Sequence, residues 1–490
     1  MGHPDAPHPD TSYLSRAEPW WRDHSDRAAW LRGFRSRIAR DTHRLAHLIH
    51  EEVGKPLDEA IAADVMALLA SVKWHEKRGA GVLRERRQRG KPAWILGVSS
   101  RVQREPIGRV GIIATWNYPV QLLGIQIVQA LFAGNSVVVK PSEHAPRTQR
   151  ALLELAAEGL PGGTLTWTDA TREAGRDLLK EHRLDHVVFT GSTSVGRMIA
   201  STLAEPLVPS TLELSGKDSA FVLDDADPML AARTIWQYVT VNSGQTCMAP
   251  RRALVHTDVY AEFVRQLGLL AAGESPRTLI TRDAALEAHR AAVEGVEAGG
   301  RPISGVLEEP GGPDGRTMRP VAIADCPEDA PTVRGDHFGP VIALVPVRDT
   351  EHALRVHHAC GQHLATSVFT KSKHRVRDLA HRLGSSVVTH NDVIMPTAHP
   401  ATFLGGRGPS GWGVSRGAEG LLAMTRPVHV ASTGRLRLPT GPTPPDQAKR
   451  LTKLVSALYG TVDAHEPTTD DHAPHTTHDP STDHQEAIKP

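Results

Sequence analysis

One cysteine and one glutamate stand out in this chain as residues that could carry out covalent chemistry. Cys247 follows the small polar stretch Gly244-Gln245-Thr246, and Glu213 lies earlier, in a Leu-Glu-Leu-Ser-Gly-Lys segment. A thiolate is the strongest nucleophile among side chains near neutral pH, but it needs a base or positively charged surroundings to form. The pair therefore predicts covalent catalysis on a carbonyl group, with Cys247 as nucleophile and Glu213 as its base.

The composition predicts a globular protein with a large core. The chain has 490 residues, of which 40% are hydrophobic and 23% charged, so two or three domains are expected. A net charge of +1 gives no reason to expect nucleic acid or a membrane as partner. Met1 to Trp21 has no apolar stretch typical of a secretory signal, and no segment has the apolar length of a transmembrane helix. The three cysteines are irregularly spaced and form no disulfide framework, so a cytoplasmic protein is expected.

The first half of the chain alternates between helical and strand patterns. Apolar residues recur at helical spacing from Asp26 to Arg87 and predict a helical lead-in. Continuous apolar runs then predict buried strands at 110–114, 136–139 and 183–189, with helices at 121–132 and 149–158 between them. This alternation indicates right-handed βαβ units and a doubly wound sheet.

The pattern restarts after Gly216 with strands at 220–223 and 253–255 and a helix at 231–241, which predicts a second α/β domain. Cys247 would lie on the connection between that helix and the second strand. The segment 299–329 is rich in Gly, Pro and acidic residues and predicts loops around a short hairpin.

Residues 440–490 are rich in Pro, Thr, Asp and His and predict a disordered tail. Within it, four apolar residues allow one amphipathic turn or two: Leu451, Leu454, Val455 and Leu458. The histidines of this tail are better explained by solvation than by a specific site, so no metal is expected.

Six motifs in order carry a family resemblance: Thr115-Trp116-Asn117-Tyr118-Pro119, Lys140-Pro141-Ser142-Glu143, Phe189-Thr190-Gly191-Ser192-Thr193, Glu213, Gly244-Gln245-Thr246-Cys247 and Phe338-Gly339-Pro340-Val341. In this order and at these separations the chain resembles the NAD(P)-dependent aldehyde dehydrogenase superfamily from about residue 25 to 432. Asn391-Asp392-Val393 and the Gly-rich stretch 405–413 look most like its shorter, class 3-like branch.

The resemblance implies an architecture. An NAD-binding domain would comprise residues 1–90 and 108–215, and a catalytic domain residues 216–424, both of them doubly wound α/β domains. Residues 91–107 and 425–435 would form a small β arm that joins a partner's sheet. A homodimer is expected, because the chain lacks the long amino-terminal extension of the tetrameric branch.

The cofactor motifs also have a physical interpretation. At Gly191-Ser192 a strand gives way to a helix, whose free N–H groups can hold a pyrophosphate. Lys140 and Glu143 follow another strand, at the carboxyl edge where nucleotides bind in open sheets. A glutamate there suits the two adenosine ribose hydroxyls and repels a 2′-phosphate, so NAD is favoured and NADP stays open. The resemblance adds the remaining cofactor residues, namely Thr115, Trp116, Ser142, Asp336 and Phe338.

The resemblance further implies how the site reacts with a small-molecule aldehyde. Cys247 would attack the carbonyl, and the amide of Asn117 and the backbone N–H of Cys247 would stabilise the resulting oxyanion. Hydride transfer to the cofactor would leave a thioester on Cys247. Glu213 would then activate the water that hydrolyses it to a carboxylic acid.

Three positions depart from the family pattern. Asp336 stands where the family has a glutamate and is one methylene shorter, which puts its reach to the nicotinamide ribose in doubt. Ser215 replaces a glycine and would add strain of about 1 kcal/mol if its φ were positive. Arg407 replaces an apolar residue and would face solvent or contact an acidic substrate.

Two other functions stay open. One is a dehydrogenase that passes the acyl group to coenzyme A, which the presence of Glu213 disfavours. The other is a catalytically weak dehydrogenase-fold protein kept for binding or structure, which the set of Cys247, Asn117 and Glu213 disfavours.

Overall fold

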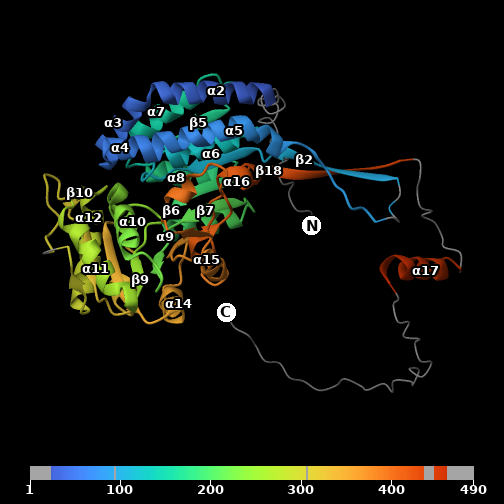
Figure 1. The fold of residues 1–490 in the computed structure, drawn as a ribbon. Coiled ribbons are helices and arrows are strands. Elements are labelled where there is room, and N and C mark those ends of the chain that lie inside the picture. The colour runs from blue at the N-terminus through green and yellow to red at the C-terminus, as the bar shows by residue number, and fades with distance from the viewer. Residues whose placement is uncertain are drawn as a thin grey trace, which may run out of the picture. The chain divides into compact units, whose positions relative to one another are not determined.

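The structure is a computed structural model that describes residues 24–92, 95, 97–181, 183–304, 307–434 and 446–460 (Figure 1). Its contacts divide the chain into two units. The larger consists of residues up to Arg89 together with Ser100–Ala431, and the smaller of Gly90–Ser99 together with the residues from Ser432 onward. The larger unit contains both α/β sheets and all the candidate site residues.

The amino-terminal part is helical, as expected. It comprises α2 (His24–Arg40), α3 (Thr42–Val53), α4 (Leu57–Glu59), the π-helix η1 (Ala60–Met66) and α5 (Ala67–Leu83). Leu45, Ile49, Val65 and Leu68 are fully buried, so the apolar stripe faces the interior.

The first sheet has six strands in the order β17-β7-β6-β3-β4-β5. Its parallel strands are β3 (Arg109–Ile113), β4 (Ser136–Lys140), β5 (Leu165–Trp167), β6 (His186–Gly191) and β7 (Ser210–Leu214), and they alternate with α6 (Gln121–Phe132), α7 (Pro146–Ala157), α8 (Arg172–Glu181) and α9 (Thr193–Ala204). Alternate side chains of each strand face opposite sides of the sheet. Val110 and Ile112 face the side covered by the amino-terminal helices, α6 and α7, whereas Ile113 and Phe189 face the side covered by α8 and α9. The expected doubly wound sheet is confirmed.

The second sheet has seven strands in the order β11-β13-β14-β9-β8-β15-β16. Its strands are β8 (Ser219–Val222), β9 (Arg252–His256), β11 (Arg301–Pro302), β13 (Val321–Ala324), β14 (Val341–Val347), β15 (Ala365–Phe369) and β16 (Val387–His390). The helices α10 (Pro228–Thr240) and α11 (Thr257–Ala272) pack on one face, and α12 (Arg282–Glu297), α13 (Pro331–Arg334), α14 (Thr350–Ala359) and α15 (Lys373–Ala380) on the other. The strands β10 (Arg277–Thr278) and β12 (Thr317–Met318) pair separately.

The chain passes from the first sheet to the second between β7 and β8, at the boundary predicted near residue 216. It later returns, because β17 (Gly411–Trp412) pairs antiparallel with β7, with Gly411 opposite Glu213. Short turns surround this return, namely η3 (Met395–Ala398) and η4 (Gly408–Ser410), and α16 (Gly417–Ala423) follows it. Gly411 and Trp412, which the sequence assigned to the catalytic domain, therefore form an edge strand of the first sheet, next to Glu213.

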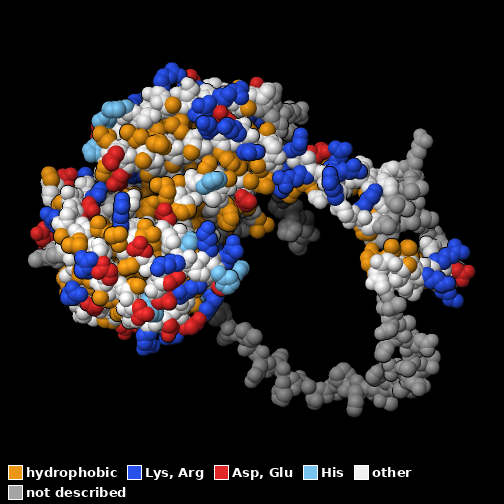
Figure 2. Space-filling model, in the orientation of Figure 1, with side chains coloured by type: hydrophobic (Ala, Val, Ile, Leu, Met, Phe, Trp, Pro, Cys, Tyr) orange, Lys and Arg blue, Asp and Glu red, His pale blue; other side chains and the backbone are white. Residues whose placement is uncertain are grey.

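The predicted arm contains a three-stranded sheet in the order β1-β2-β18, made of β1 (Arg86–Arg87), β2 (Val98–Pro106) and β18 (Thr425–Thr433). Ser100 on β2 and His429 on β18 hydrogen-bond through their side chains. Figure 2 shows basic side chains gathered along this sheet. The start of the expected excursion, Ala93, lies outside the described residues.

In the smaller unit, α17 (Gln447–Tyr459) is a helix that is longer than the one or two turns expected within the tail. Residues 440–445 and 461–490 of that expected disordered tail lie outside the described residues. In the described part of the chain, no helix is both long and apolar enough to span a membrane.

Several predicted boundaries shift, and two of them lie beside long-range hydrogen bonds. The helix expected at 149–158 begins at Pro146, because the carboxylate of Glu52 accepts hydrogen bonds from the backbone N–H groups of Arg147 and Thr148. The strand expected at 183–189 begins only at His186. Asp185, just before it, accepts a 2.8 Å hydrogen bond from the Arg109 backbone N–H through its side chain.

Candidate active site

The three predicted catalytic residues line one small cavity. Asn117 follows β3, Glu213 lies on β7, and Cys247 follows the 3-10 turn η2 (Val241–Gly244) after α10. The cavity has a volume of about 40 Å³ and is otherwise lined by Thr115, Leu122, Thr190, Gly191, Leu214, Ser215, Leu364 and Leu404. Since a water molecule takes about 30 Å³ of liquid, this cavity admits water beside the thiol.

Hydrogen bonds join the Asn117 loop to the Cys247 loop. Asn117 is buried, and its Nδ2 donates to the carbonyl oxygen of Gln245 at 3.1 Å. The backbone oxygen of Asn117 accepts from Asn242 Nδ2 at 2.9 Å. A primary amide has two N–H groups, so one hydrogen bond to Gln245 leaves the second N–H as a donor for an oxyanion.

The segment before Cys247 has an unusual backbone. Asn242, Ser243 and Gly244 are left-handed in succession, with φ of 52°, 56° and 70°. A Cβ on Gly244 would lie 2.4 Å from the carbonyl carbon of Gly339, so only glycine fits there. Side-chain contacts hold the run in place, including Ser243 Oγ to the Thr278 carbonyl oxygen at 2.7 Å. Strain of this kind is typical of functional sites.

A fully buried arginine supports the same segment. Arg251 donates to the carbonyl oxygens of Gly244 at 3.3 Å and Thr246 at 3.1 Å. Its Nε lies 3.7 Å from Asp336 Oδ1, and its guanidinium 5.3 Å from the centre of the Phe338 ring. Asp336, expected at the cofactor, therefore also pairs with the arginine that holds the nucleophile's loop.

The Cys247 side chain is partly buried. Burial raises its pKa to about 12, and the nearby carboxylates of Asp218 and Glu213 add to this. The charges of Arg416 and Arg251 act in the opposite direction. A base must therefore remove the proton before the sulfur can attack.

Glu213, the predicted base, lies in the same cavity as Cys247. It is buried, and its Oε1 has no hydrogen-bond partner among the described residues. Burial raises the pKa of its carboxyl, while hydrogen bonds from Ser415 and Thr190 and the charge of Arg416 lower it. A carboxyl with a raised pKa and a free oxygen is suited to accept a proton from a thiol or a water.

Sequence reasoning missed a buried ion pair beneath the site. Lys55 Nζ lies 2.5 Å from Asp64 Oδ2 and donates to the Asn117 backbone oxygen at 2.9 Å. Asp64, on the π-helix η1, also accepts from the N–H groups of Val120 and Gln121 at the start of α6. The pair thus fixes the loop that contains Asn117 through hydrogen bonds to its backbone. No signal in the sequence could have found it, because neither residue belongs to a recognisable motif.

The predicted ribose residues meet at the end of β4. Glu143 pairs with Lys140 at 2.7 Å and with Arg172 at 3.1 Å. Burial opposes ionisation of Glu143, but hydrogen bonds from Lys140 and Arg172 hold its pKa at about 2. The carboxylate is therefore charged throughout the neutral range and can accept hydrogen bonds from a sugar diol.

Thr115, Trp116, Gly191 and Ser192 lie at the ends of β3 and β6 on the same edge of this sheet, whereas Asp336 and Phe338 precede β14 of the second sheet. The rings of Trp116 and Phe338 meet edge to face with centroids 5.8 Å apart. Gly191 ends β6, and Ser192 caps α9 by accepting from the Val195 N–H. Gln149, which sequence reasoning missed, links Thr115 and Ser142: its amide donates to the Thr115 carbonyl at 2.7 Å and accepts from the Ser142 N–H at 2.6 Å.

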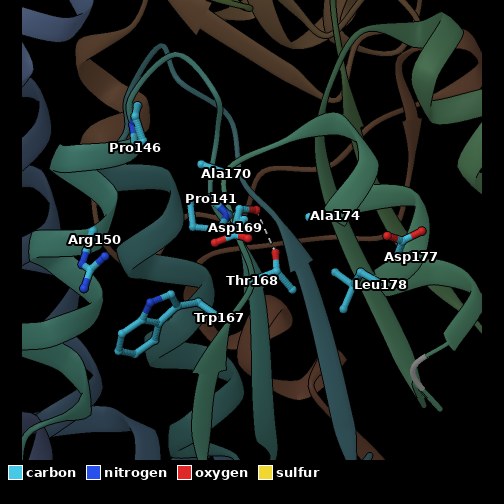
Figure 3. A pocket seen from close by; sticks show the side chains of 10 residues that line it. All are labelled: Pro141, Pro146, Arg150, Trp167, Thr168, Asp169, Ala170, Ala174, Asp177 and Leu178. Carbon is cyan, nitrogen blue, oxygen red and sulfur yellow. Dashed lines mark hydrogen bonds between the residues drawn. The ribbon is translucent and has the colours of Figure 1, made fainter.

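A larger cavity of about 590 Å³ opens beside these residues, at the carboxyl ends of β4 and β5 (Figure 3). Pro141 and Trp167 lie at the strand ends, Arg150 projects from α7, and Asp177 and Leu178 from α8 (Figure 3). Figure 3 also shows the hydrogen bond from Thr168 Oγ1 to the Asp169 carbonyl oxygen. The position of this cavity at the sheet edge and the size of the cavity suit a nucleotide base.

Two of the departures from the family pattern have clear structures. Ser215 is not among the described residues with positive φ, so the strain considered for it does not arise. Arg407 is exposed, and its Nη1 donates to the Ser385 carbonyl oxygen at 3.3 Å. Arg407 faces solvent and does not line the cavity at Cys247.

Three histidines, His357, His358 and His363, approach one another closely enough to be considered for a metal. The rings of His357 and His363 stack with centroids 3.6 Å apart, so their nitrogen lone pairs lie in nearly parallel planes. Both nitrogens of His357 already pair, with Ser219 Oγ at 3.0 Å and the Leu383 carbonyl oxygen at 2.9 Å. This geometry does not direct three ligands at one ion.

Comparison with known proteins agrees with the fold. The family described as "Aldehyde dehydrogenase family" matches residues 15–430. The chain is 31% identical over 437 residues to a 4,4'-diapolycopene aldehyde oxidase of Methylomonas sp., covering 87% of this chain and 81% of that protein. It is 28% identical over 438 residues to aldehyde dehydrogenase family 3 member B1 of Mus musculus, covering 88% and 92%. The expected likeness to class 3 members is confirmed.

Among solved structures, the NAD-dependent aldehyde dehydrogenase from Sinorhizobium meliloti superposes with a TM-score of 0.81 at 25% identity, covering 88% of this chain and 86% of that one. The α/β fold expected from the sequence is therefore shared over most of the chain.

Proposed function

The chain belongs to the aldehyde dehydrogenase family, and on this premise we propose that it oxidises an aldehyde to a carboxylic acid with NAD(P). The reaction would pass through a thioester on Cys247, which is hydrolysed by a water that Glu213 activates. The observation that carries the proposal is the shared cavity. It brings Cys247, Glu213 and Asn117 together from three separate parts of the chain.

NAD is the proposed cofactor, and NADP stays open. The charged Glu143, with Lys140 beside it, would hold the adenosine ribose, and the 590 Å³ cavity would take the adenine. The turn at Gly191-Ser192 would hold the pyrophosphate, because the start of α9 offers N–H groups there. Thr115, Trp116, Ser142, Phe338 and Asp336 complete the proposed set. When bound, the cofactor accepts a hydride from the substrate carbon.

The reaction begins at sulfur. Glu213 takes the thiol proton of Cys247, directly or through water, and the thiolate adds to the aldehyde carbon. The carbonyl oxygen becomes negative and is stabilised by the free N–H of the Asn117 amide and the backbone N–H of Cys247. One such donor contributes about 3 to 4 kcal/mol to lowering the barrier. Loss of hydride from the same carbon leaves the acyl group on sulfur as a thioester.

The second half of the reaction depends on Glu213. Once Glu213 has passed the thiol proton on to solvent, its carboxylate removes a proton from water as the water oxygen attacks the thioester carbon, and Cys247 leaves as the thiolate. Hydrolysis is favoured over transfer to coenzyme A, because the base lies in a cavity that admits water. The other alternative is a weak dehydrogenase-fold protein kept for binding or structure. Such a protein would not require a buried glutamate whose Oε1 lacks a hydrogen-bond partner among the described residues.

Two further features belong to the proposal. A homodimer would form through the arm of β2 and β18, with an exposed edge of its sheet available for a partner strand. A cytoplasmic location suits the three free cysteines.

The decisive experiment measures NADH formation at 340 nm from the full chain with NAD and a panel of aldehydes, with and without coenzyme A. Cys247→Ala is the test variant, and Cys326→Ala is the matched control because that thiol is buried away from the site. NADH formation without coenzyme A that is lost only in Cys247→Ala supports the proposal. Activity that requires coenzyme A would favour the acylating enzyme. Binding of NAD without turnover would favour the protein kept for binding or structure.

A further inference from the structure

The side chain of Gln362 joins three segments that lie far apart in the sequence. Gln362 is half-buried in the turn between α14 and β15 of the second sheet. Its Nε2 donates to the backbone oxygen of Ser215 at 2.5 Å and to Thr193 Oγ1 at 2.9 Å, and it approaches the Pro409 carbonyl oxygen at 3.4 Å. Thr193 Oγ1 in turn donates to the same Pro409 oxygen at 3.4 Å. One amide group therefore connects all three segments.

Each of these segments borders the proposed site. Thr193 is the first residue of α9, whose start would hold the pyrophosphate of the cofactor. Ser215 lies two residues after Glu213 and lines the small cavity of the predicted catalytic residues. Pro409 lies in η4, directly before β17, which pairs with the strand of Glu213. Gln362 thus contacts both the cofactor edge of the first sheet and the wall of the small cavity.

The backbone around Gln362 is fixed to the crossover between the two sheets. The Lys217 N–H donates to the Gln362 carbonyl oxygen at 2.9 Å. The Leu364 N–H donates to the buried Asp218 carboxylate at 2.8 Å, and Leu364 itself lines the small cavity. The two segments pack without a gap, because a Cβ on Gly216 would lie 2.7 Å from the Leu364 Cβ. The Gln362 amide is therefore held by a backbone that has little freedom to move.

This position matters for hydride transfer. The substrate carbon would be held on Cys247, between α10 and β9, whereas the cofactor would be held at the edge of the first sheet. The distance between the two depends on contacts that join these parts of the molecule, and a misplacement of about 1 Å can slow a reaction about 100-fold. Gln362 reaches from the second sheet to α9 of the first, so it spans the junction on which this distance depends.

We propose that Gln362 is a positioning residue that holds the start of α9 against the wall of the small cavity, and so sets the place of the bound cofactor relative to Cys247. This inference rests on the proposed function. A glutamine suits the task, because its amide carries two N–H groups and can serve neighbouring oxygen acceptors. If Gln362 were only structural, its loss would lower stability and leave the folded protein unchanged.

The first test replaces the amide by an apolar group of similar size. Gln362→Leu should bind NAD about fivefold more weakly by calorimetry, because it loses the hydrogen bonds that order the cofactor edge. With saturating NAD and the best aldehyde, single-turnover NADH formation should slow about tenfold. The matched control is Gln266→Leu, which removes another half-buried amide, one that donates to Glu262 within α11 at 2.7 Å. This control should change neither quantity.

The second test makes the donor depend on pH. Gln362→Glu keeps the shape of the side chain, but at neutral pH it places a carboxylate against the Ser215 and Pro409 carbonyl oxygens, whereas the protonated carboxyl has an O–H to donate. Its affinity for NAD relative to wild type should therefore recover between pH 8 and pH 5, while Gln362→Leu should stay weaker by the same factor. A loss in Gln362→Glu that ignores pH would overturn the proposal. So would wild-type affinity in both variants, or an equal loss in Gln266→Leu.

The third test needs no cofactor. Thr193→Val removes the hydroxyl that Gln362 contacts, so Gln362→Leu should lower the urea midpoint less in the Thr193→Val background than in wild type. Equal losses in the two backgrounds would show that the contact is not made. If wild type forms no NADH with any aldehyde, the proposed function fails, yet a smaller loss in the Thr193→Val background and a weaker NAD affinity of Gln362→Leu would still support the role of Gln362.

Discussion

The side-chain amide of Asn117 donates a 3.1 Å hydrogen bond to the carbonyl oxygen of Gln245, two residues before Cys247. The same carbonyl oxygen accepts from Asn242 Nδ2 at 3.1 Å. The proposed oxyanion donor and the nucleophile are therefore held relative to each other by direct contacts between two loops. Catalysis of the proposed kind depends on such preorganised positions, because a shift of one ångström weakens an oxyanion contact strongly.

Replacing Asn117 tests the oxyanion donor. Asn117→Ala should lower kcat about 100- to 1000-fold, the usual cost of one such donor. Steady-state kinetics with NAD and the best aldehyde would measure this. Asn135→Ala is the matched control, since the buried Asn135 side chain bonds, among the described residues, to backbone groups of Gly108, Ala130 and Met424. The control should lose stability and keep the kcat of its folded fraction, and a kcat for Asn117→Ala within twofold of wild type would contradict the role.

Glu213 should make stability depend on pH in a definite direction. Burial raises the pKa of its carboxyl above the ordinary 4.5, so the folded state binds this proton more tightly than the unfolded chain. Its contribution to stability is then fully present below 4.5 and is lost as the pH rises through the raised pKa. Glutamine cannot ionise, so Glu213→Gln should have a higher melting temperature than wild type at pH 8, and this advantage should shrink toward pH 4.

Melting curves from pH 4 to 9 would check this, with Glu287→Gln as a control because that glutamate is exposed on α12. A difference between Glu213→Gln and wild type that does not change with pH would contradict the raised pKa. The same variant should both form and hydrolyse the thioester on Cys247 slowly, because the proposed mechanism uses the Glu213 carboxylate in both steps, and mass spectrometry of quenched enzyme over a single turnover would detect this.

The Lys55 and Asp64 pair should be essential for stability. Lys55→Met leaves the fully buried Asp64 carboxylate without its counter-charge, and removing one partner of a buried pair costs about 3 to 5 kcal/mol. The double variant Lys55→Met/Asp64→Asn removes the uncompensated charge and should recover a large part of the loss. Urea unfolding of the set would measure both effects. A loss below about 1 kcal/mol for Lys55→Met would show that the pair is not structural.

Glu143 should govern cofactor choice. Glu143→Gln should raise KM for NAD about tenfold or more, since hydrogen bonds to charged groups contribute about 1.5 to 3 kcal/mol. It should raise KM for NADP less, because the repulsion of a 2′-phosphate disappears. Because the pKa of Glu143 is about 2, its charge does not change between pH 5 and 9, and it should cause no change in the wild-type KM for NAD over this range. Glu173→Gln, which alters an exposed pair on α8, serves as control. Equal changes for NAD and NADP would oppose this role.

Much of the fold follows from local sequence. Val137, Val138 and Val139 lie in a β-branched run that predicts a doubly buried strand, and β4 forms there. The helix 121–132 matches α6 at both ends. Boundaries shift where the deciding contact is distant, as when Glu52 caps α7 across a long stretch of chain.

The sequence by itself selected Cys247, Glu213 and Asn117 as the predicted catalytic residues, because each belongs to a motif whose chemistry depends on residue type. Only the tertiary structure decided what surrounds them. Lys55, which bonds to the Asn117 backbone, and Arg416, whose charge acts to lower the pKa of Glu213, belong to no motif. Their roles arise from burial and from charges that meet across the fold, and burial depends on how distant segments pack rather than on neighbours in the chain.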